Sequence, residues 1–442
     1  MAKLFKPAGS KSRGKVKVSR HKPKRVELDI QRLADDGRGI AHHNGKVVFV
    51  AGALPGETVQ ATVKEQSRRF DQAICDTRLN DAPERVEPFC QHYGACGGCQ
   101  LQHLDIAAQR QHKVQRLAQA LPPAASIPEI AVLSGKPLAY RHRVRLHYRQ
   151  GRLGFLARQS NSLVEVAECP LLQDALSASL KAIRQPLLEA LGQHDSGELR
   201  LAVGDDGRVG LSLSSHQARS ESWCEQLAQH LTPDATLYQV ASQCGEWHSD
   251  ASPLTLNVYD DSAGSQLALL FRPNHFSQAS PELNRGMVDW CMAGLQAQSG
   301  EPVADYFCGL GNFSRPLAQR GAKVLAVDLD RAMLAEADAQ RDRAREAIDY
   351  RCADLFDGEQ IPLPKALTKV LLDPPRAGAK SLCERLAVAR HVRTVAYVSC
   401  DPATLKRDLA ILAGAGFSVK AAAMVDMFPH TQHQESMVLL TR

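Results

Sequence analysis

The sequence contains no long apolar run, no internal repeat and no low-complexity stretch beyond its first residues. No apolar segment approaches the roughly 20 residues that a membrane-spanning helix needs, so we expect no membrane partner. The basic N-terminus lacks the apolar core of a secretory signal, and we therefore expect a cytoplasmic protein. A length of 442 residues is too great for one hydrophobic core and predicts two to four domains.

Acidic residues are absent from the first 25 positions, which hold ten Lys or Arg residues. Subtracting these ten charges from the net charge of +6 leaves −4 for the rest of the chain. Such a run is normally solvated and often contacts nucleic acid, although it can also serve solubility alone. We interpret residues 1–25 as a basic disordered tail.

Cysteines are plentiful, but twelve of them in a cytoplasmic chain argue against a disulfide framework. The stretch FCQHYGACGGCQ spaces Cys90, Cys96 and Cys99 as C-x5-C-x2-C. The best candidate for a fourth ligand is Cys169, because a Cys-Pro pair often closes an iron–sulfur site. The pattern favours a [4Fe-4S] cluster with a structural or RNA-positioning role. Zinc held by four cysteines and unliganded thiols are the alternatives.

Two domains are predicted before residue 266. Residues 26–80 contain short strand patterns punctuated by glycine and Asp-Gly, which predict a small β-barrel of the oligonucleotide-binding kind. Residues 81–265 contain the cysteine cluster, a helix over 103–121 and a hairpin around an Asp-Asp-Gly turn. We interpret them as a central α+β domain that carries the iron–sulfur cluster and binds RNA.

A basic strand lies within the central domain, from Tyr140 to Arg152. Alternation with a period of two places five potential cations on one strand face, namely Arg141, Arg143, Arg145, His147 and Arg149. Val144, Leu146 and Tyr148 share the other face. A phosphate backbone is the natural partner of such a row. The alternative is a solvated sheet face that is balanced by acids such as Glu165 and Glu168.

Residues 266–442 alternate between strands and helices, which predicts a doubly wound parallel sheet. In DYFCGLGNFS, Gly309 and Gly311 form a turn between strand and helix, and Asp328 ends the next strand 19 residues after Gly309. This pattern is typical of adenosine-ribose binding. Ser314 replaces the third glycine of a dinucleotide site, which favours S-adenosylmethionine (SAM) over NAD. We expect Asp354 to lie near the adenine.

Two further strand ends carry candidate catalytic groups. Asp373 in LLDPPRAG precedes two prolines, an arrangement that recurs in methyltransferases acting on planar bases, although a tight turn is the alternative. Cys400 lies between a buried strand and a helix start with Asp401 as cap and Pro402 in the first turn. We expect the helix terminus to lower the pKa of this thiol and make it a nucleophile. A buried, unreactive cysteine is the alternative.

A thiolate nucleophile suits methylation of uracil at C5, which is too weakly nucleophilic to react unaided. Addition of the thiolate to C6 activates C5, and a base must then remove the C5 proton. Glu435, just before the last strand, is the first candidate for this base, and His430 and His433 rank below it. A surface salt bridge is the alternative role for Glu435.

Together these motifs resemble the RNA uracil-C5 methyltransferases. The segments FSQ, DYFCGLGNF, LLDPPRAG, YVSCDPATLKRD and DMFPHTQHQESMVLL follow that family's pattern in order over residues 266–442. The cysteine cluster and GIAHHNGKVVFVAGALPGE are similar to the subgroup with a TRAM barrel and a [4Fe-4S] cluster. The resemblance implies a Rossmann-like SAM methyltransferase domain, 23S ribosomal RNA as substrate, and a monomer.

The resemblance also implies roles for individual residues. Cys400 is the expected nucleophile and Glu435 the base, acting on a flipped-out uridine. The expected cofactor and target-base site comprises Gln278, Phe307, Asn312, Asp328, Asp354 and Asp373. The family often has Glu at the position of Asp328, and either acid accepts ribose hydrogen bonds. The alternatives are a dual-site rRNA methyltransferase, a non-catalytic RNA-binding factor and an NAD-linked iron–sulfur oxidoreductase.

Overall fold

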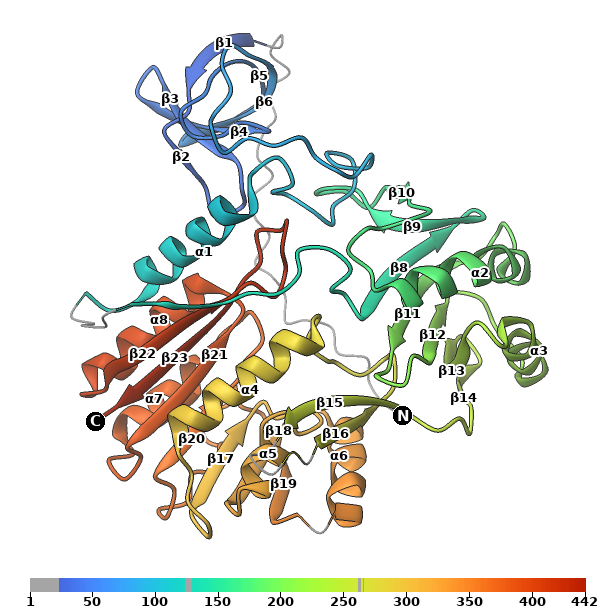
Figure 1. The fold of residues 1–442 in the computed structure, drawn as a ribbon, viewed down its shortest axis with the longest axis vertical. Coiled ribbons are helices and arrows are strands. Elements are labelled where there is room, and N and C mark those ends of the chain that lie inside the picture. Colours follow the sequence, from blue (N-terminus) through green and yellow to red (C-terminus); the bar gives the residue numbers. More distant parts are fainter. Residues whose placement is uncertain (1–23, 124–128, 261–263, 265, 345) are drawn as a thin grey trace. The chain divides into compact units, whose positions relative to one another are not determined.

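The computed structural model describes residues 24–123, 129–260, 264, 266–344 and 346–442 (Figure 1). Most of the predicted basic tail, residues 1–23, lies outside the described residues. The chain divides into two compact units. The first comprises the residues up to Phe89 together with Gln100–Ala108, and the second comprises Cys90–Cys99 and Gln109–Arg442. No helix in the described part of the chain is long and apolar enough to cross a membrane.

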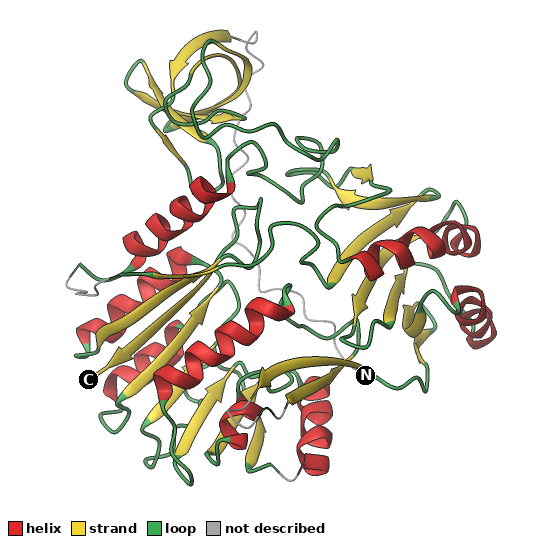
Figure 2. Ribbon diagram, viewed as in Figure 1, coloured by secondary structure: helices red, strands yellow, loops and turns green. Residues whose placement is uncertain are grey.

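The first unit is a six-stranded sheet that curls into a small barrel (Figure 2). Its strand order is β1-β5-β6-β4-β3-β2, and only the β4–β6 pair is parallel. Valine and alanine side chains, many of them at alternate strand positions, fill its core. The predicted barrel is thus confirmed, and its strands are β1 (Lys24–Asp29), β2 (Arg32–Leu33), β3 (Gly39–His43), β4 (Lys46–Ala51), β5 (Thr58–Gln66) and β6 (Phe70–Arg78).

The central part of the second unit is a seven-stranded sheet in the order β10-β9-β8-β11-β12-β13-β14. Its strands are β8 (Arg143–Arg149), β9 (Arg152–Leu156), β10 (Leu163–Glu165), β11 (Ser196–Val203), β12 (Val209–Ser215), β13 (Thr236–Ser242) and β14 (Gly245–His248). Helices α2 (Asp174–Leu191) and α3 (Glu221–Leu231) pack on one face through a shared leucine-rich core (Figure 1). The predicted hairpin is the antiparallel β11–β12 pair.

The remainder of the second unit contains an eight-stranded sheet in the order β19-β18-β17-β20-β21-β23-β22-β7. Its strands are β7 (Ala131–Leu133), β17 (Pro302–Tyr306), β18 (Lys323–Asp328), β19 (Ile348–Cys352), β20 (Lys369–Leu372), β21 (Thr394–Ser399), β22 (Ser418–Val425) and β23 (Glu435–Thr441). All its pairs are parallel except those of β23. The predicted doubly wound sheet is therefore confirmed.

Helices cover both faces of this sheet. One face packs against α4 (Pro281–Leu295), α5 (Ser314–Gln319) and α6 (Arg331–Ala344). The other packs against α7 (Lys380–Val388), α8 (Pro402–Gly414) and the later part of α1 (Ile106–Ala120). A separate hairpin of β15 (Leu254–Asp260) and β16 (Gln266–Phe271) joins the first of these cores and spans residue 266, where we expected the methyltransferase domain to begin.

Candidate active site

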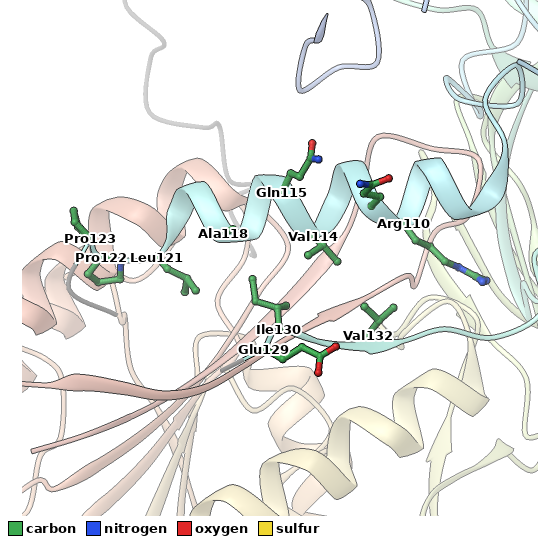
Figure 3. Close-up of a pocket in the computed structure, with 11 residues that line it drawn as sticks. Arg110, Val114, Gln115, Ala118, Leu121, Pro122, Pro123, Glu129, Ile130 and Val132 are labelled. Carbon is green, nitrogen blue, oxygen red and sulfur yellow. The ribbon is translucent and has the colours of Figure 1, made fainter. Parts of the chain in front are cut away.

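The described residues of the second unit form at least two cavities that are large enough for a ligand. One, of about 730 Å³, lies between α1 and the segment that leads into β7, where Val114, Leu121 and Ile130 face each other (Figure 3). It contains none of the predicted site residues. The other, of about 540 Å³, opens at the carboxyl ends of the parallel strands, where α/β sheets bind their ligands.

The second cavity, which we call the active-site cavity, brings together seven of the eight residues predicted for catalysis and cofactor binding. Its wall includes Gln278, Phe307, Asn312, Asp328, Asp373, Cys400 and Glu435. Asp354 is not part of the wall. Residues that the sequence reasoning did not assign complete it, among them Phe271, Leu310, Met333, Phe356 and Arg376. Their apolar or basic character carries no sequence signal that separates them from ordinary core or surface residues.

The glycine turn after β17 is held open toward this cavity. Phe307 adopts a positive φ of 66° and donates its N–H to Val327 O at 2.8 Å. Gly311 also has a positive φ, and a Cβ there would lie 2.7 Å from the Tyr350 hydroxyl, so only glycine fits. Asp328 accepts the N–H of Gly309 at 3.0 Å through Oδ2. Its carboxylate is therefore fixed beside the turn, as a ribose-binding acid requires.

Asn312 is oriented by a second asparagine. Its side-chain amide exchanges two hydrogen bonds with Asn284 of α4, at 2.8 and 3.0 Å. Asn284 is almost fully buried, so the pair is shielded from competing water. The sequence reasoning missed Asn284, because a single polar residue within an amphipathic helix is not distinctive.

The loop with Gln278 is attached to the central sheet. His142 Nε2 lies 2.7 Å from Gln278 O, and burial lowers the pKa of His142 to about 4, so the ring is neutral. Arg143 donates to Ser277 O at 2.9 Å and lies over the Phe276 ring at 5.7 Å. One cation of the predicted basic strand therefore holds this loop in the free protein.

Asp354 acts on the cavity wall indirectly. Its carboxylate accepts the N–H of Phe356 at 2.9 Å and so shapes the turn after β19. The Phe356 and Phe307 rings lie 5.9 Å apart, centroid to centroid, and both belong to the wall. The expected contact between Asp354 and adenine stays a prediction.

Asp373 lies at the end of β20, in a loop anchored by Asp408 of α8. The fully buried Asp408 accepts hydrogen bonds from Ala379 N and the Tyr397 hydroxyl, each at 2.7 Å. Gly378, at φ 73°, leaves room for this carboxylate, since a Cβ there would lie 2.6 Å from its Oδ2. Burial, together with Asp305, raises the pKa of Asp373 to about 7.

Cys400 has the predicted backbone setting but a different acidity. Asp401 caps α8 by accepting the N–H groups of Ala403 and Thr404, each at 3.0 Å. However, the expectation of a lowered thiol pKa was wrong. Burial and then the carboxylates of Glu435 and Asp373 raise the pKa of Cys400 to about 12. Loss of hydration and repulsion by the two carboxylates therefore raise the pKa of the thiol by more than the helix terminus lowers it.

The Arg376 guanidinium opposes the rise in the pKa of Cys400. It lowers the pKa of both Cys400 and Glu435, and it belongs to the cavity wall. Arg376 Nη2 also lies 3.4 Å from His433 Nδ1. It was part of the quoted LLDPPRAG motif, but no pattern in the sequence distinguished its role.

Glu435, the first residue of β23, is only 5% exposed. Burial and the nearby Asp373 raise its pKa well above the usual value. The two lower-ranked bases, His430 and His433, do not line the cavity. Burial lowers the pKa of both rings, that of His433 to about 4. The structure thus places Glu435 beside Cys400 and the two histidines elsewhere.

The four predicted cluster cysteines are half-buried and belong to the second unit. The Gly98 N–H lies 3.3 Å from Cys96 Sγ. Burial raises the pKa of Cys96 and Cys169, and the Cys90 thiol adds to both shifts. Across the described ranges, no group of three or more His, Cys, Asp or Glu side chains is arranged to hold a metal ion. The iron–sulfur cluster therefore stays a prediction.

The basic strand is β8, and its alternation is as predicted. Val144, Leu146 and Tyr148 are buried against the helices, whereas Arg145 and Arg149 are exposed. The local acid on the basic face is Glu198 of β11, which lies 3.9 Å from Arg145 and 4.0 Å from His147. The expected Glu165 instead pairs with Arg184 at 2.9 Å. The pairing of β8 with β11 places Glu198 on this face, and the sequence pattern did not reveal that pairing.

The fold and the glycine turn define the class, a Rossmann-like SAM-dependent methyltransferase with an N-terminal TRAM barrel. The family described as tRNA (Uracil-5-)-methyltransferase matches residues 248–350 and 359–442, and the TRAM domain matches residues 21–73. A solved Pyrococcus abyssi tRNA (uracil-54, C5)-methyltransferase in complex with S-adenosyl-L-homocysteine shares the fold, with a TM-score of 0.71 and 21% identity. The alignment covers 94% of this chain and 100% of that one.

Full-length relatives identify the family. A Halomonas elongata protein is 41% identical over 440 residues, which cover 94% of this chain and 89% of the relative. An Aeromonas hydrophila protein is 36% identical, with 100% of both chains covered. Both are named 23S rRNA (uracil(1939)-C(5))-methyltransferase RlmD. The chain belongs to the RNA uracil-C5 methyltransferase family, which confirms the resemblance seen in its motifs.

Proposed function

We propose that this chain transfers a methyl group from SAM to C5 of a uracil in 23S ribosomal RNA, at the position 1939 for which its relatives are named. One observation carries the proposal. Cys400, Asp373 and Glu435 share a single cavity with the glycine turn and Asp328. This arrangement places a nucleophile and a base beside the cofactor-binding turn, as C5 methylation requires.

Each residue of the cavity has a defined task in this reaction. SAM, when bound, supplies an electrophilic methyl group. The Cys400 thiol loses its proton to solvent and its sulfur adds to C6, which makes C5 nucleophilic. C5 then takes the methyl group of SAM, and S-adenosylhomocysteine is released. Glu435 then accepts the C5 proton, and loss of the thiolate restores the C5–C6 double bond. Asp328 would bind the ribose hydroxyls.

Methyl transfer to rRNA tests the proposal directly. Purified protein is incubated with tritiated SAM and fragments of 23S rRNA, and 5-methyluridine is identified after digestion. We expect label in the fragment that contains position 1939. Label at two separated uridines would support the dual-site alternative. If SAM binds but no rRNA fragment is methylated, the chain is an RNA-binding factor and the proposal fails.

SAM binding should depend on pH through Asp373. Because the pKa of Asp373 is raised to about 7, its carboxylate is neutralised as the pH falls below 7 and ceases to attract a sulfonium. We expect SAM affinity, measured by calorimetry, to rise by up to about tenfold from pH 6 to pH 8. S-adenosylhomocysteine, whose sulfur is neutral, should show a much smaller change.

The matched variant is Asp373→Asn, for which SAM affinity should depend little on pH. Asp305 is also buried with a pKa of about 7, but it does not line the cavity. Loss of the pH dependence in Asp373→Asn would therefore assign the effect to Asp373 and not to Asp305. Equal pH dependence for the two ligands would contradict the assignment.

We also propose that Cys90, Cys96, Cys99 and Cys169 hold the [4Fe-4S] cluster. Support comes from the sequence spacing of the four cysteines, from the electrostatic effect of the Cys90 and Cys96 thiols on Cys169, and from the Gly98 N–H beside Cys96 Sγ. Backbone N–H groups near sulfur are typical of such sites. When bound, the cluster would cross-link loop 90–99 to the segment around Cys169.

Metal and sulfide analysis tests this ligand set. Protein prepared without oxygen should contain about four iron atoms and acid-labile sulfide per chain. Cys96→Ala should lose most of both, whereas Cys244→Ala, which changes an exposed thiol on the β13–β14 turn, should lose neither. One zinc atom without sulfide would favour the zinc alternative. Unchanged iron in Cys96→Ala would contradict the assignment of that ligand.

The RNA partner is expected to contact the TRAM barrel and the exposed cations of β8, Arg145 and Arg149. Both features suit a phosphate backbone rather than a specific base. The basic tail adds ten positive charges that also suit a phosphate backbone. The monomeric state stays a prediction.

A further inference from the structure

A buried ion pair lies beneath the loop that ends at Glu435. Lys113 of α1 is fully buried, and its Nζ donates to Asp426 Oδ1 at 2.7 Å and to Phe428 O at 2.9 Å. Asp426 is also fully buried and accepts from Arg110 Nε at 3.1 Å. A buried charge pair loses hydration and is often replaceable by apolar residues without loss of stability. Stability alone is therefore a weak explanation for it.

The same face of α1 makes further bonds to this loop. Gln109 Oε1 accepts the His430 N–H at 2.8 Å, and Arg116 Nη1 donates to Gln432 O at 2.7 Å. Positions 109, 113 and 116 recur at the spacing of one helix face. The opposite side of α1, with Val114 and Leu121, faces the other cavity (Figure 3).

Residues 426–434, which we call the base loop, connect β22 to β23. Three of the bonds from α1 reach its backbone, at Phe428 O, His430 N and Gln432 O. His430 adopts a positive φ of 65°, which is unfavourable for a residue with a side chain. The bonds from α1 therefore fix the path of the loop together with an internal bond from the Thr431 hydroxyl to Phe428 O, and the loop ends where Glu435 enters the cavity wall.

We infer that the Lys113–Asp426 pair positions Glu435 for removal of the C5 proton. Lys113 and Asp426 do not line the active-site cavity, so they are positioning residues. In that step the C5–H bond breaks and its proton bonds to the Glu435 carboxylate. The C–H electrons form the C5–C6 double bond, and the C6–S bond breaks with its electrons on sulfur. The inference depends on the proposed function, in which Glu435 is the base.

The inference predicts a defect in one step only. Displacement of a catalytic group by about 1 Å can slow a step by roughly a hundredfold. Methyl transfer does not need Glu435 as a base, whereas decay of the methylated Cys400–RNA adduct does. Loss of the pair should therefore lengthen the life of the adduct. It should also increase the isotope effect of deuterium at C5, because proton removal becomes rate-limiting.

The test variant is Lys113→Met combined with Asp426→Leu, which removes both charges and leaves neither one buried alone. The matched control is Lys369→Met. Lys369 likewise bonds a carboxylate and a backbone oxygen, Glu301 at 2.8 Å and Gln296 O at 2.9 Å, at the start of β20. The control loses the lysine of a partly exposed pair, whose side chains are 18% and 20% exposed, without touching the base loop.

The measurement is single-turnover methylation of an rRNA fragment with hydrogen or deuterium at C5 of the target uridine. Adduct is followed on denaturing gels. For the double variant we expect methyl transfer within about threefold of wild type and adduct decay slowed about tenfold or more. The C5 isotope effect should be larger than that of wild type, and Lys369→Met should behave as wild type.

Glu435→Gln separates failure of the inference from failure of the proposed function. If Glu435→Gln accumulates adduct but the double variant does not, the inference is overturned and the function stands. If both methyl transfer and adduct decay slow equally in the double variant, the pair has only a structural role, which also overturns the inference. If Glu435→Gln forms no excess adduct, the base assignment fails.

Discussion

The Cys400→Ala variant is expected to bind SAM as wild type does and to lose rRNA methylation by about 10⁴-fold or more. The Cys400 thiol is the group expected to add to C6, and Ala cannot replace it. Cys308 also lines the active-site cavity, but it is almost fully buried, and burial raises its pKa well above the usual value. SAM affinity should persist because the glycine turn and Asp328 are held by their own hydrogen bonds, such as that from Gly309. Calorimetry with SAM and a tritium-transfer assay measure the two properties separately.

A fluorinated substrate makes the nucleophile visible. With 5-fluorouridine at the target position, the final proton removal is blocked, so the methylated RNA stays attached to the protein. Wild type and Cys244→Ala should both form this adduct, and Cys400→Ala should not. Methylation retained by Cys400→Ala would exclude covalent catalysis by this residue and reopen the search for the nucleophile.

The polar residues of the cavity wall that could be predicted from local patterns lie at strand ends. Asp328 is the last residue of a buried strand, and Asp373 and Cys400 come directly after buried strands. The carboxyl ends of parallel strands meet at one edge of a sheet. Gln278 was found only through the family resemblance, because no local pattern marks it.

The properties that depend on three-dimensional neighbours could not be predicted. The helix start at Cys400 was visible in the sequence. The burial that raises its pKa, and the two carboxylates that add to this rise, depend on packing with other strands. Strand β7 has three residues, too few for a periodic pattern, and it pairs with β22 far along the chain. Lys113 resembles a solvent-exposed lysine of an amphipathic helix, although it is fully buried on Asp426.

The second large effect is expected from Glu435→Gln. Turnover should fall by roughly 10²- to 10⁴-fold, the range typical for loss of a general base. With ordinary uridine in the RNA, the methylated adduct should now accumulate, because Gln cannot accept the C5 proton. Denaturing gels with tritiated SAM measure the adduct, and Glu359→Gln, a change at an exposed residue, should leave turnover and adduct unchanged.

Stability gives an independent check that Glu435→Gln remains folded. Burial and Asp373 raise the folded-state pKa of Glu435, so the folded protein binds this proton more tightly than the unfolded chain does. Ionisation of Glu435 therefore costs stability as the pH rises above the unfolded pKa. A neutral Gln avoids that cost, and the melting temperature of the variant at pH 8 should equal or exceed that of wild type. Lost turnover without adduct, in a variant this stable, would mean that Glu435 acts before methyl transfer rather than after it.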